Sequence, residues 1–118
     1  MLKIVILLKR RPGMSREDFI RHYEAVHSVL AVKLVPGMID YRRNFIDPAK
    51  TVFGVSNEHP GFDCITEMVF PDQATYERAF AEFSKQEVID AITQDEEKLF
   101  DRSTIRSYFV DEFVSKLK

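Results

Sequence analysis

The sequence has few of the residues that build several common kinds of functional site. It contains one cysteine and no tryptophan among 118 residues. A single cysteine cannot form an internal disulfide, and it excludes zinc and iron–sulfur sites that need several cysteines. The sequence contains no glycine-rich phosphate loop, no G-x-G-x-x-G and no Gly-x-Ser-x-Gly. We therefore expect no cofactor.

An excess of positive charge is also missing. The chain has 17 Lys and Arg against 19 Asp and Glu, for a net charge of -2. Such a balance provides no cationic field for nucleic-acid phosphates. The apolar run over residues 1–9 is too short to span a bilayer and lacks a signal-peptide cleavage site. We therefore expect a cytoplasmic protein that binds neither nucleic acid nor membrane.

The remaining composition is that of a globular domain, with 45% hydrophobic and 31% charged residues. The length fits a single domain over residues 1–118. A domain of this size buries a limited fraction of its surface, which favours pairing with a second copy.

Three Pro-Gly pairs divide the chain, because proline presets φ and glycine tolerates a positive φ. Apolar spacing of two residues predicts strands between these turns, and spacing of three to four residues predicts helices. The predicted strands cover residues 2–10, 38–46, 63–70 and 103–114. The predicted helices run from the N-cap Ser15 to about Lys33, from Pro71-Asp72 onward, and again from a capping box at Ser84-Lys85-Gln86-Glu87. Residues 47–62 form a long loop.

The order strand, helix, strand, strand, helices, strand predicts an α+β fold, the ferredoxin-like plait βαββαβ. Its four-stranded antiparallel sheet would carry helices on one face. Every predicted strand has apolar residues on both sides, so an uncovered face would leave a large apolar patch. We therefore expect a homodimer that packs sheet to sheet.

The histidines are the first candidates for chemistry. His27 falls on the sheet-facing side of the first helix, and imidazole titrates near neutral pH, so His27 could be a general acid or base. A core histidine is the alternative. His22 is expected on the surface, and His59 in the long loop is either solvated or part of a lid. His22 and His27 lie about 140° apart on an α-helix, so we expect no metal site.

Three strand residues complete the candidates. Cys64 is expected to be a buried, inert thiol, because no neighbouring base is visible that would lower its pKa. Glu67 needs a partner. That partner is His27 if Glu67 faces the helices, or Arg42, Arg43 or Arg106 across the sheet, which is the interpretation we favour slightly. The Tyr41 hydroxyl either enters a pocket or belongs to a half-buried packing residue.

Several short motifs together resemble EthD-domain proteins. They are KIVILLKRRPGMS at residues 3–15, FIRHYEAVH at 19–27, VPGM at 35–38 with Tyr41, and DCITEMVF at 63–70. The resemblance implies a dimeric α+β barrel, in which two plaits pack sheet to sheet and ligands occupy a cavity between helices and sheet. It points to His27 and Tyr41 as catalytic residues, and to Tyr23 and Glu67 as ligand-binding residues. Cys64, Met68 and Val69 depart from the family's usual third strand, which bears on the shape of the pocket.

Three hypotheses for the function follow. The first is a cofactor-independent enzyme, an isomerase, cyclase or dehydratase, in which His27 moves a proton α to the carbonyl of a small hydrophobic or aromatic compound and Tyr41 hydrogen-bonds the enolate. The second is a non-catalytic dimeric protein that binds such a compound or assists an oxygenase. The third is a cofactor-free monooxygenase, an oxidoreductase.

Overall fold

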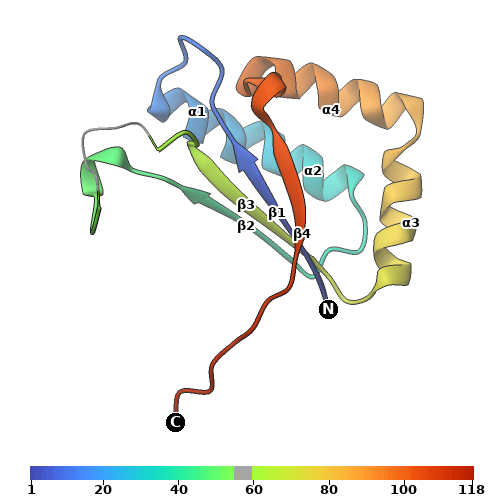
Figure 1. Cartoon of the computed structure of the whole chain (residues 1–118). Helices are drawn as coiled ribbons and strands as arrows, with labels where there is room; N and C mark the ends of the chain where they lie inside the picture. Colours follow the sequence, from blue (N-terminus) through green and yellow to red (C-terminus); the bar gives the residue numbers. More distant parts are fainter. Residues whose placement is uncertain (55–59) are drawn as a thin grey trace.

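Four antiparallel strands form one sheet in the order β2-β3-β1-β4 (Figure 1). The computed structural model describes residues 1–54 and 60–118, so the loop histidine His59 lies outside the described residues. The strands are β1 (Leu2–Leu8), β2 (Asp40–Phe45), β3 (Cys64–Phe70) and β4 (Arg106–Val110). The helices lie on one side of this sheet (Figure 1). The predicted ferredoxin-like α+β fold is confirmed.

The first helical segment contains an interruption that the apolar spacing did not predict. It consists of α1 (Arg16–His22), a π-helical turn (Tyr23–His27) and α2 (Ser28–Leu34). The predicted N-cap forms, because Ser15 Oγ accepts a hydrogen bond from the Asp18 amide at 3.1 Å. The π turn closes with a bond from the Ser28 amide to the Tyr23 carbonyl, five residues back. The prediction of an unbroken α-helix to about Lys33 was therefore wrong at the π turn.

The second helical segment divides as predicted, into α3 (Gln73–Phe83) and α4 (Gln86–Leu99). Asp72 caps α3 through its Oδ1, which accepts from the Thr75 amide at 2.7 Å. The capping box predicted for α4 does not form, because Lys85 occupies the N-cap position. The Ser84 hydroxyl instead donates to the Phe80 carbonyl at 2.8 Å. Ser84 thus serves the end of α3 rather than the start of α4.

β4 is shorter than predicted. A 3-10 turn (Arg102–Thr104) precedes it, and it ends at Val110. Its last residue, Val110, pairs with Lys3 of β1. Residues 111–118 leave the sheet and project from the body of the molecule (Figure 1).

The core lies between the helices and one face of the sheet, which we call the inner face. Its buried members are Leu8, Phe19, Tyr23, Cys64, Leu99 and Phe100. Phe19 is completely buried and makes edge-to-face contacts with Tyr23, Phe45 and Phe100 at centroid distances of 6.0, 5.9 and 5.9 Å. Alternation along β1 places Ile4, Ile6 and Leu8 on the inner face. No helix among the described residues is long and apolar enough to cross a membrane.

Cys64 is fully buried in this core, at the start of β3. Its Sγ lies 3.5 Å from Thr66 Oγ1. Burial raises the pKa of the Cys64 thiol to about 11, because a thiolate is poorly solvated there. The thiol is therefore protonated at neutral pH.

Truncating the central aromatic residue tests the core. We expect Phe19→Ala to lower the free energy of unfolding by about 3–5 kcal/mol, since it leaves a cavity where three rings meet. Phe53, which is 96% exposed, provides the matched control, and Phe53→Ala should change stability by less than about 0.5 kcal/mol. Urea denaturation measures both. Equal effects of the two substitutions would contradict the assigned core.

The thiol can be tested by alkylation. The difference between the pKa of about 11 and the ordinary 9.0 reduces the thiolate fraction about 100-fold. We expect iodoacetamide to react with the native protein at least that much more slowly than with the urea-unfolded chain at pH 8. The native rate should rise with pH toward 11. Equal native and unfolded rates would show that Cys64 is accessible and ionised.

Candidate functional site

A cavity of about 320 Å³ lies between the inner face of the sheet and the helices. This size falls within the range of small-molecule sites. Its wall is mainly aliphatic and aromatic, with contributions from β1, β3, α3 and Phe100. Six of its lining residues carry polar groups: Tyr23, His27, Tyr41, Tyr76, Glu96 and Ser107. The cavity can therefore hold an apolar ligand that has a few polar atoms.

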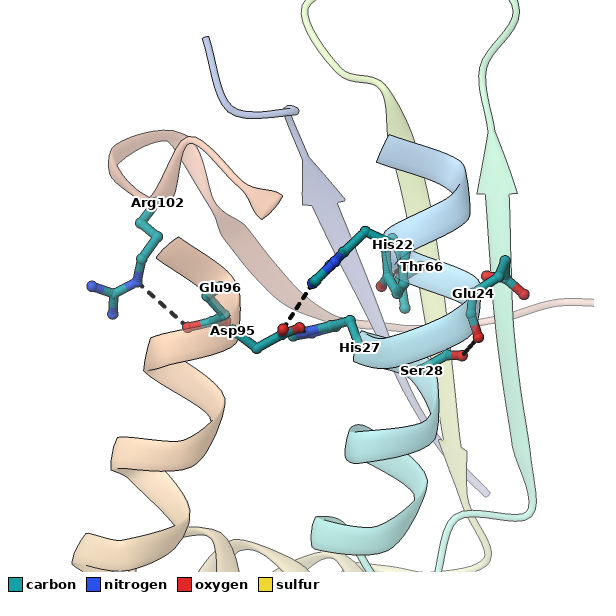
Figure 2. Close-up of polar contacts among 9 residues, drawn as sticks. His22, Glu24, His27, Ser28, Thr66, Asp95, Glu96 and Arg102 are labelled. Carbon is teal, nitrogen blue, oxygen red and sulfur yellow. Dashed lines mark hydrogen bonds and ion pairs between the residues drawn. The ribbon is translucent and has the colours of Figure 1, made fainter. Parts of the chain in front are cut away.

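Two histidines meet on one buried carboxylate at this cavity (Figure 2). His27 Nδ1 lies 2.8 Å from Asp95 Oδ2, and His22 Nε2 lies 2.8 Å from Asp95 Oδ1. The sequence prediction placed the two histidines 140° apart and left His22 on the surface. The 140° separation was wrong, because the π turn widens the helix between them. Its hydrogen bonds span five residues, so residues five apart stack much as residues four apart do in an α-helix. The His22 side chain is 25% exposed, and it also bonds the buried Asp95.

The contact with Asp95 determines which nitrogen of His27 is free. A carboxylate only accepts hydrogen bonds, so Nδ1 carries the proton and donates it. Within residues 1–54 and 60–118, Nε2 has no hydrogen-bond partner. The rings of Tyr23 and Phe100 meet the imidazole edge-on, at centroid distances of 5.3 and 5.1 Å. Because His27 lines the cavity, Nε2 is the nitrogen available to a ligand.

Glu96, the neighbour of Asp95 on α4, lines the same cavity. Its carboxyl lies 3.5 Å from Arg102 Nε (Figure 2). Burial raises the pKa of Glu96, although the nearby His27 and Arg102 oppose the rise. A carboxyl with a raised pKa can donate a proton to a ligand nearer neutral pH.

The sequence prediction missed both Asp95 and Glu96, although the apolar spacing contained a signal for them. The predicted stripe of α4 includes Ile92 and Leu99, and the positions between them on that stripe are 95 and 96. Carboxylates therefore interrupt an apolar stripe. Such groups need partners when buried, and that requirement could have drawn attention to them.

Tyr41 and Tyr23 form the polar end of the cavity on the sheet side. The Tyr23 hydroxyl lies 2.6 Å from Thr66 Oγ1. Burial raises the pKa of both tyrosines, and the Tyr23 hydroxyl and Arg43 partly oppose the rise at Tyr41. Arg43 lies over the Tyr41 ring at 4.7 Å and forms two hydrogen bonds with Glu24. Both hydroxyls are thus protonated at neutral pH. The structure brings Tyr23, His27 and Tyr41 to one cavity.

Glu67 is not part of this group. It lies on the opposite face of the sheet, which we call the open face, so it cannot pair with His27. Its Oε1 lies 2.7 Å from Lys3 Nζ, and Asn44 donates to its Oε2 at 3.2 Å. The partner is thus a lysine rather than one of the three arginines. Lys3 on β1 is the diagonal neighbour of Glu67 on β3, and Arg42, which lies directly opposite Glu67 on β2, pairs with Asp40 instead. Both interactions lower the pKa of Glu67.

In the described residues, no three His, Cys, Asp or Glu side chains are arranged to hold a metal ion. In the cluster of two histidines and Asp95, each carboxylate oxygen instead accepts a hydrogen bond from one imidazole. What the arrangement can do chemically is hold one imidazole nitrogen, two phenols and a carboxyl around an apolar space.

Solved structures with the same fold come from several organisms. An ethyl tert-butyl ether D (EthD) family protein from Bacillus halodurans is 22% identical, with a TM-score of 0.63 over 96% of this chain and 100% of that chain. HapK from Hahella chejuensis is 9% identical, with a TM-score of 0.64 over 100% and 98%. A NIPSNAP-like domain protein from Burkholderia xenovorans is 14% identical, with a TM-score of 0.61 over 99% and 89%. At these identities the likeness concerns the fold alone.

A comparison with curated proteins finds no match. A family comparison does find one: the model of the EthD domain matches residues 11–103, a span that contains the π turn, both histidines, Tyr41 and Asp95. Since this match covers most of the chain and the fold agrees with it, the protein belongs to the EthD domain family.

Proposed function

We propose that this protein binds a small hydrophobic or aromatic carbonyl compound in the cavity and moves a proton α to the carbonyl without a cofactor. The observation that carries the proposal is the state of His27. Its Nδ1 is held by a buried carboxylate while its Nε2 is left to an apolar cavity. An imidazole with one nitrogen fixed and the other free is well suited to general acid–base catalysis.

The proton transfer uses groups on opposite walls of the cavity. His27 Nε2 takes the α proton, and the C–H electron pair moves into the enolate. The protonated Tyr41 hydroxyl donates a hydrogen bond to the enolate oxygen. The imidazolium that forms is stabilised by Asp95. Returning the proton to another carbon completes an isomerisation. In a dehydration the enolate electron pair forms the C=C bond, the β C–O bond breaks, and the hydroxyl leaves as water with the proton of the His27 imidazolium.

Two further cavity residues support the same chemistry. Glu96 has a raised pKa and lines the cavity, so it is a second group that can deliver a proton to the ligand. Tyr23 closes the wall between His27 and Thr66 and contributes to ligand binding. The remaining aliphatic and aromatic wall favours a hydrophobic or aromatic substrate over a polar one.

We also propose that the working form is a homodimer packed through the open face. This face carries a row of apolar side chains among charged ones: Val5, Leu7, Ile65, Val69, Tyr108 and Val110. Three of the charged groups on it are paired with one another, since Lys3 bonds both Glu67 and Glu112. Glu67 therefore belongs to the proposed interface rather than to the cavity. The projecting residues 111–118 add the exposed Phe113, Val114 and Leu117.

Deuterium exchange tests the chemistry without knowledge of the natural substrate. In D₂O, the protein should catalyse exchange of the α protons of at least one small aromatic ketone, with acetophenone and 2-tetralone as first probes. We expect His27→Gln to slow this exchange by about 10²–10⁴-fold, because the base is lost. Tyr41→Phe should slow it by about 10²-fold, because the enolate loses a donor. Proton NMR of the ketones measures the rates.

The matched control is Lys33→Gln, an exposed residue of α2. It should leave the rate unchanged. Full exchange by His27→Gln would reject the proposal. Ketone binding without exchange would favour the binding-protein hypothesis, and substrate-dependent oxygen uptake would favour the monooxygenase hypothesis; either result counts against proton transfer as the function.

Sedimentation velocity tests the dimer. We expect a dimer at micromolar concentration and a shift toward monomer in Tyr108→Lys, since a charge would then be buried between two sheets. Val29, an equally apolar and exposed residue on α2, provides the control. Val29→Lys should leave the dimer intact. A stable monomer of the unaltered protein would contradict the proposed packing.

A further inference from the structure

We propose that Asp95 and His22 are positioning residues that fix His27 as its Nδ1-protonated tautomer and so direct the lone pair of Nε2 into the cavity. The inference rests on the proposed function for its catalytic meaning, because there His27 is the base. Its structural content stands on the geometry of the three side chains and can be tested without any substrate.

The first step is the bonding of Asp95. Its side chain is only 8% exposed, so its charge needs compensation. Both carboxylate oxygens accept a hydrogen bond, Oδ2 from His27 and Oδ1 from His22, each at 2.8 Å. The bond from His22 removes the freedom of the carboxylate to rotate about its own axis. Asp95 therefore presents Oδ2 to His27 in one orientation.

The second step is the unequal position of the two histidines. The His27 side chain is 8% exposed and lines the cavity, whereas that of His22 is 25% exposed and is absent from the cavity wall. His22, the last residue of α1, thus approaches the same carboxylate from the more exposed side of the cluster. It cannot contact a ligand in the cavity, so its contribution to the site acts through Asp95.

The third step is the π turn, which makes the double contact possible. In a regular α-helix the 140° between residues five apart would let only one of the two histidines face Asp95. The turn also skips the Glu24 carbonyl, which the Ser28 amide would bond in an α-helix. The Ser28 hydroxyl donates to that carbonyl instead, at 2.9 Å (Figure 2). The carbonyl that the π turn leaves without an amide donor therefore finds a donor in the next residue of the helix. Single π turns inside α-helices are frequent at functional sites.

The other charged and titratable neighbours of His27 could also influence which of its ring nitrogens is protonated. Glu96 and Tyr23 also face it, but neither bonds an imidazole nitrogen. Arg102 pairs with Glu96 rather than with Asp95. The tautomer of His27 thus depends on Asp95.

Nitrogen-15 NMR of the imidazole rings tests this inference directly, because the two tautomers protonate different ring nitrogens. In the unaltered protein, the neutral ring of His27 should carry its proton on Nδ1. In Asp95→Asn, the amide NH₂ can donate to Nδ1, so we expect the proton to move to Nε2. Asp90→Asn, on an exposed part of the same helix, should leave the His27 signals in place.

His22 is tested by a pair of variants. His22→Phe should leave His27 in a mixture of tautomers, because Asp95 loses the bond that orients it. His22→Gln can still donate to Oδ1 and should restore the single Nδ1-protonated form. Where the ketone exchange is active, Asp95→Asn should reduce its rate on the order of 10²–10⁴-fold although His27 is present.

The inference is overturned if His27 keeps the Nδ1 proton in Asp95→Asn, or if His22→Phe leaves a single tautomer. Amide spectra of both variants check that they fold. Failure of the proposed function gives a different result: the tautomer changes as expected, but no ketone exchanges with the unaltered protein.

Discussion

A buried carboxylate that bonds two imidazoles holds the candidate site together. Burying the charge of Asp95 would cost several kcal/mol if it were unpaired, so the fold must bring donors to it. Both donors come from the first helical segment, while Asp95 lies on α4. The contact therefore joins the first helical segment to α4. The π turn makes this double contact possible, and the contact in turn orients His27.

The two faces of the sheet have different roles because side chains alternate along each strand. On β3, Thr66 and Met68 point to the core and the cavity, and Glu67 between them points to Lys3 on the open face. On the inner face, the Thr66 hydroxyl is bonded to that of Tyr23 from the helical segment. Tyr41 and Ser107, which also lie on this face, line the cavity. The inner face thus offers few polar groups that can act on a ligand.

Membership of the EthD domain family accounts for the fold, whereas the chemistry depends on individual side chains. The three solved structures described above share this fold but are at most 22% identical to this chain in sequence. Their names refer to different kinds of protein. A fold of this kind hosts unrelated functions, so function has to be argued from the site. Here that argument depends on one imidazole nitrogen, its buried carboxylate and the apolar space beside them.

The resemblance to EthD-domain proteins pointed to a cavity and to Tyr23 and Tyr41 as site residues. The spacing of residues in the sequence by itself determined the order of the elements, the sheet with helices on one side, and the sheet-facing side of the helix for His27. Local spacing carries this information, because strand and helix periods decide which side chains share a face. The tertiary structure alone decided that His22 joins His27 on Asp95, that Glu67 pairs with Lys3, and that β4 ends at Val110. These outcomes depend on the π turn and on strand pairing. A single-segment pattern contains none of them, because each is an interaction between residues distant in sequence or a departure from the regular helical period.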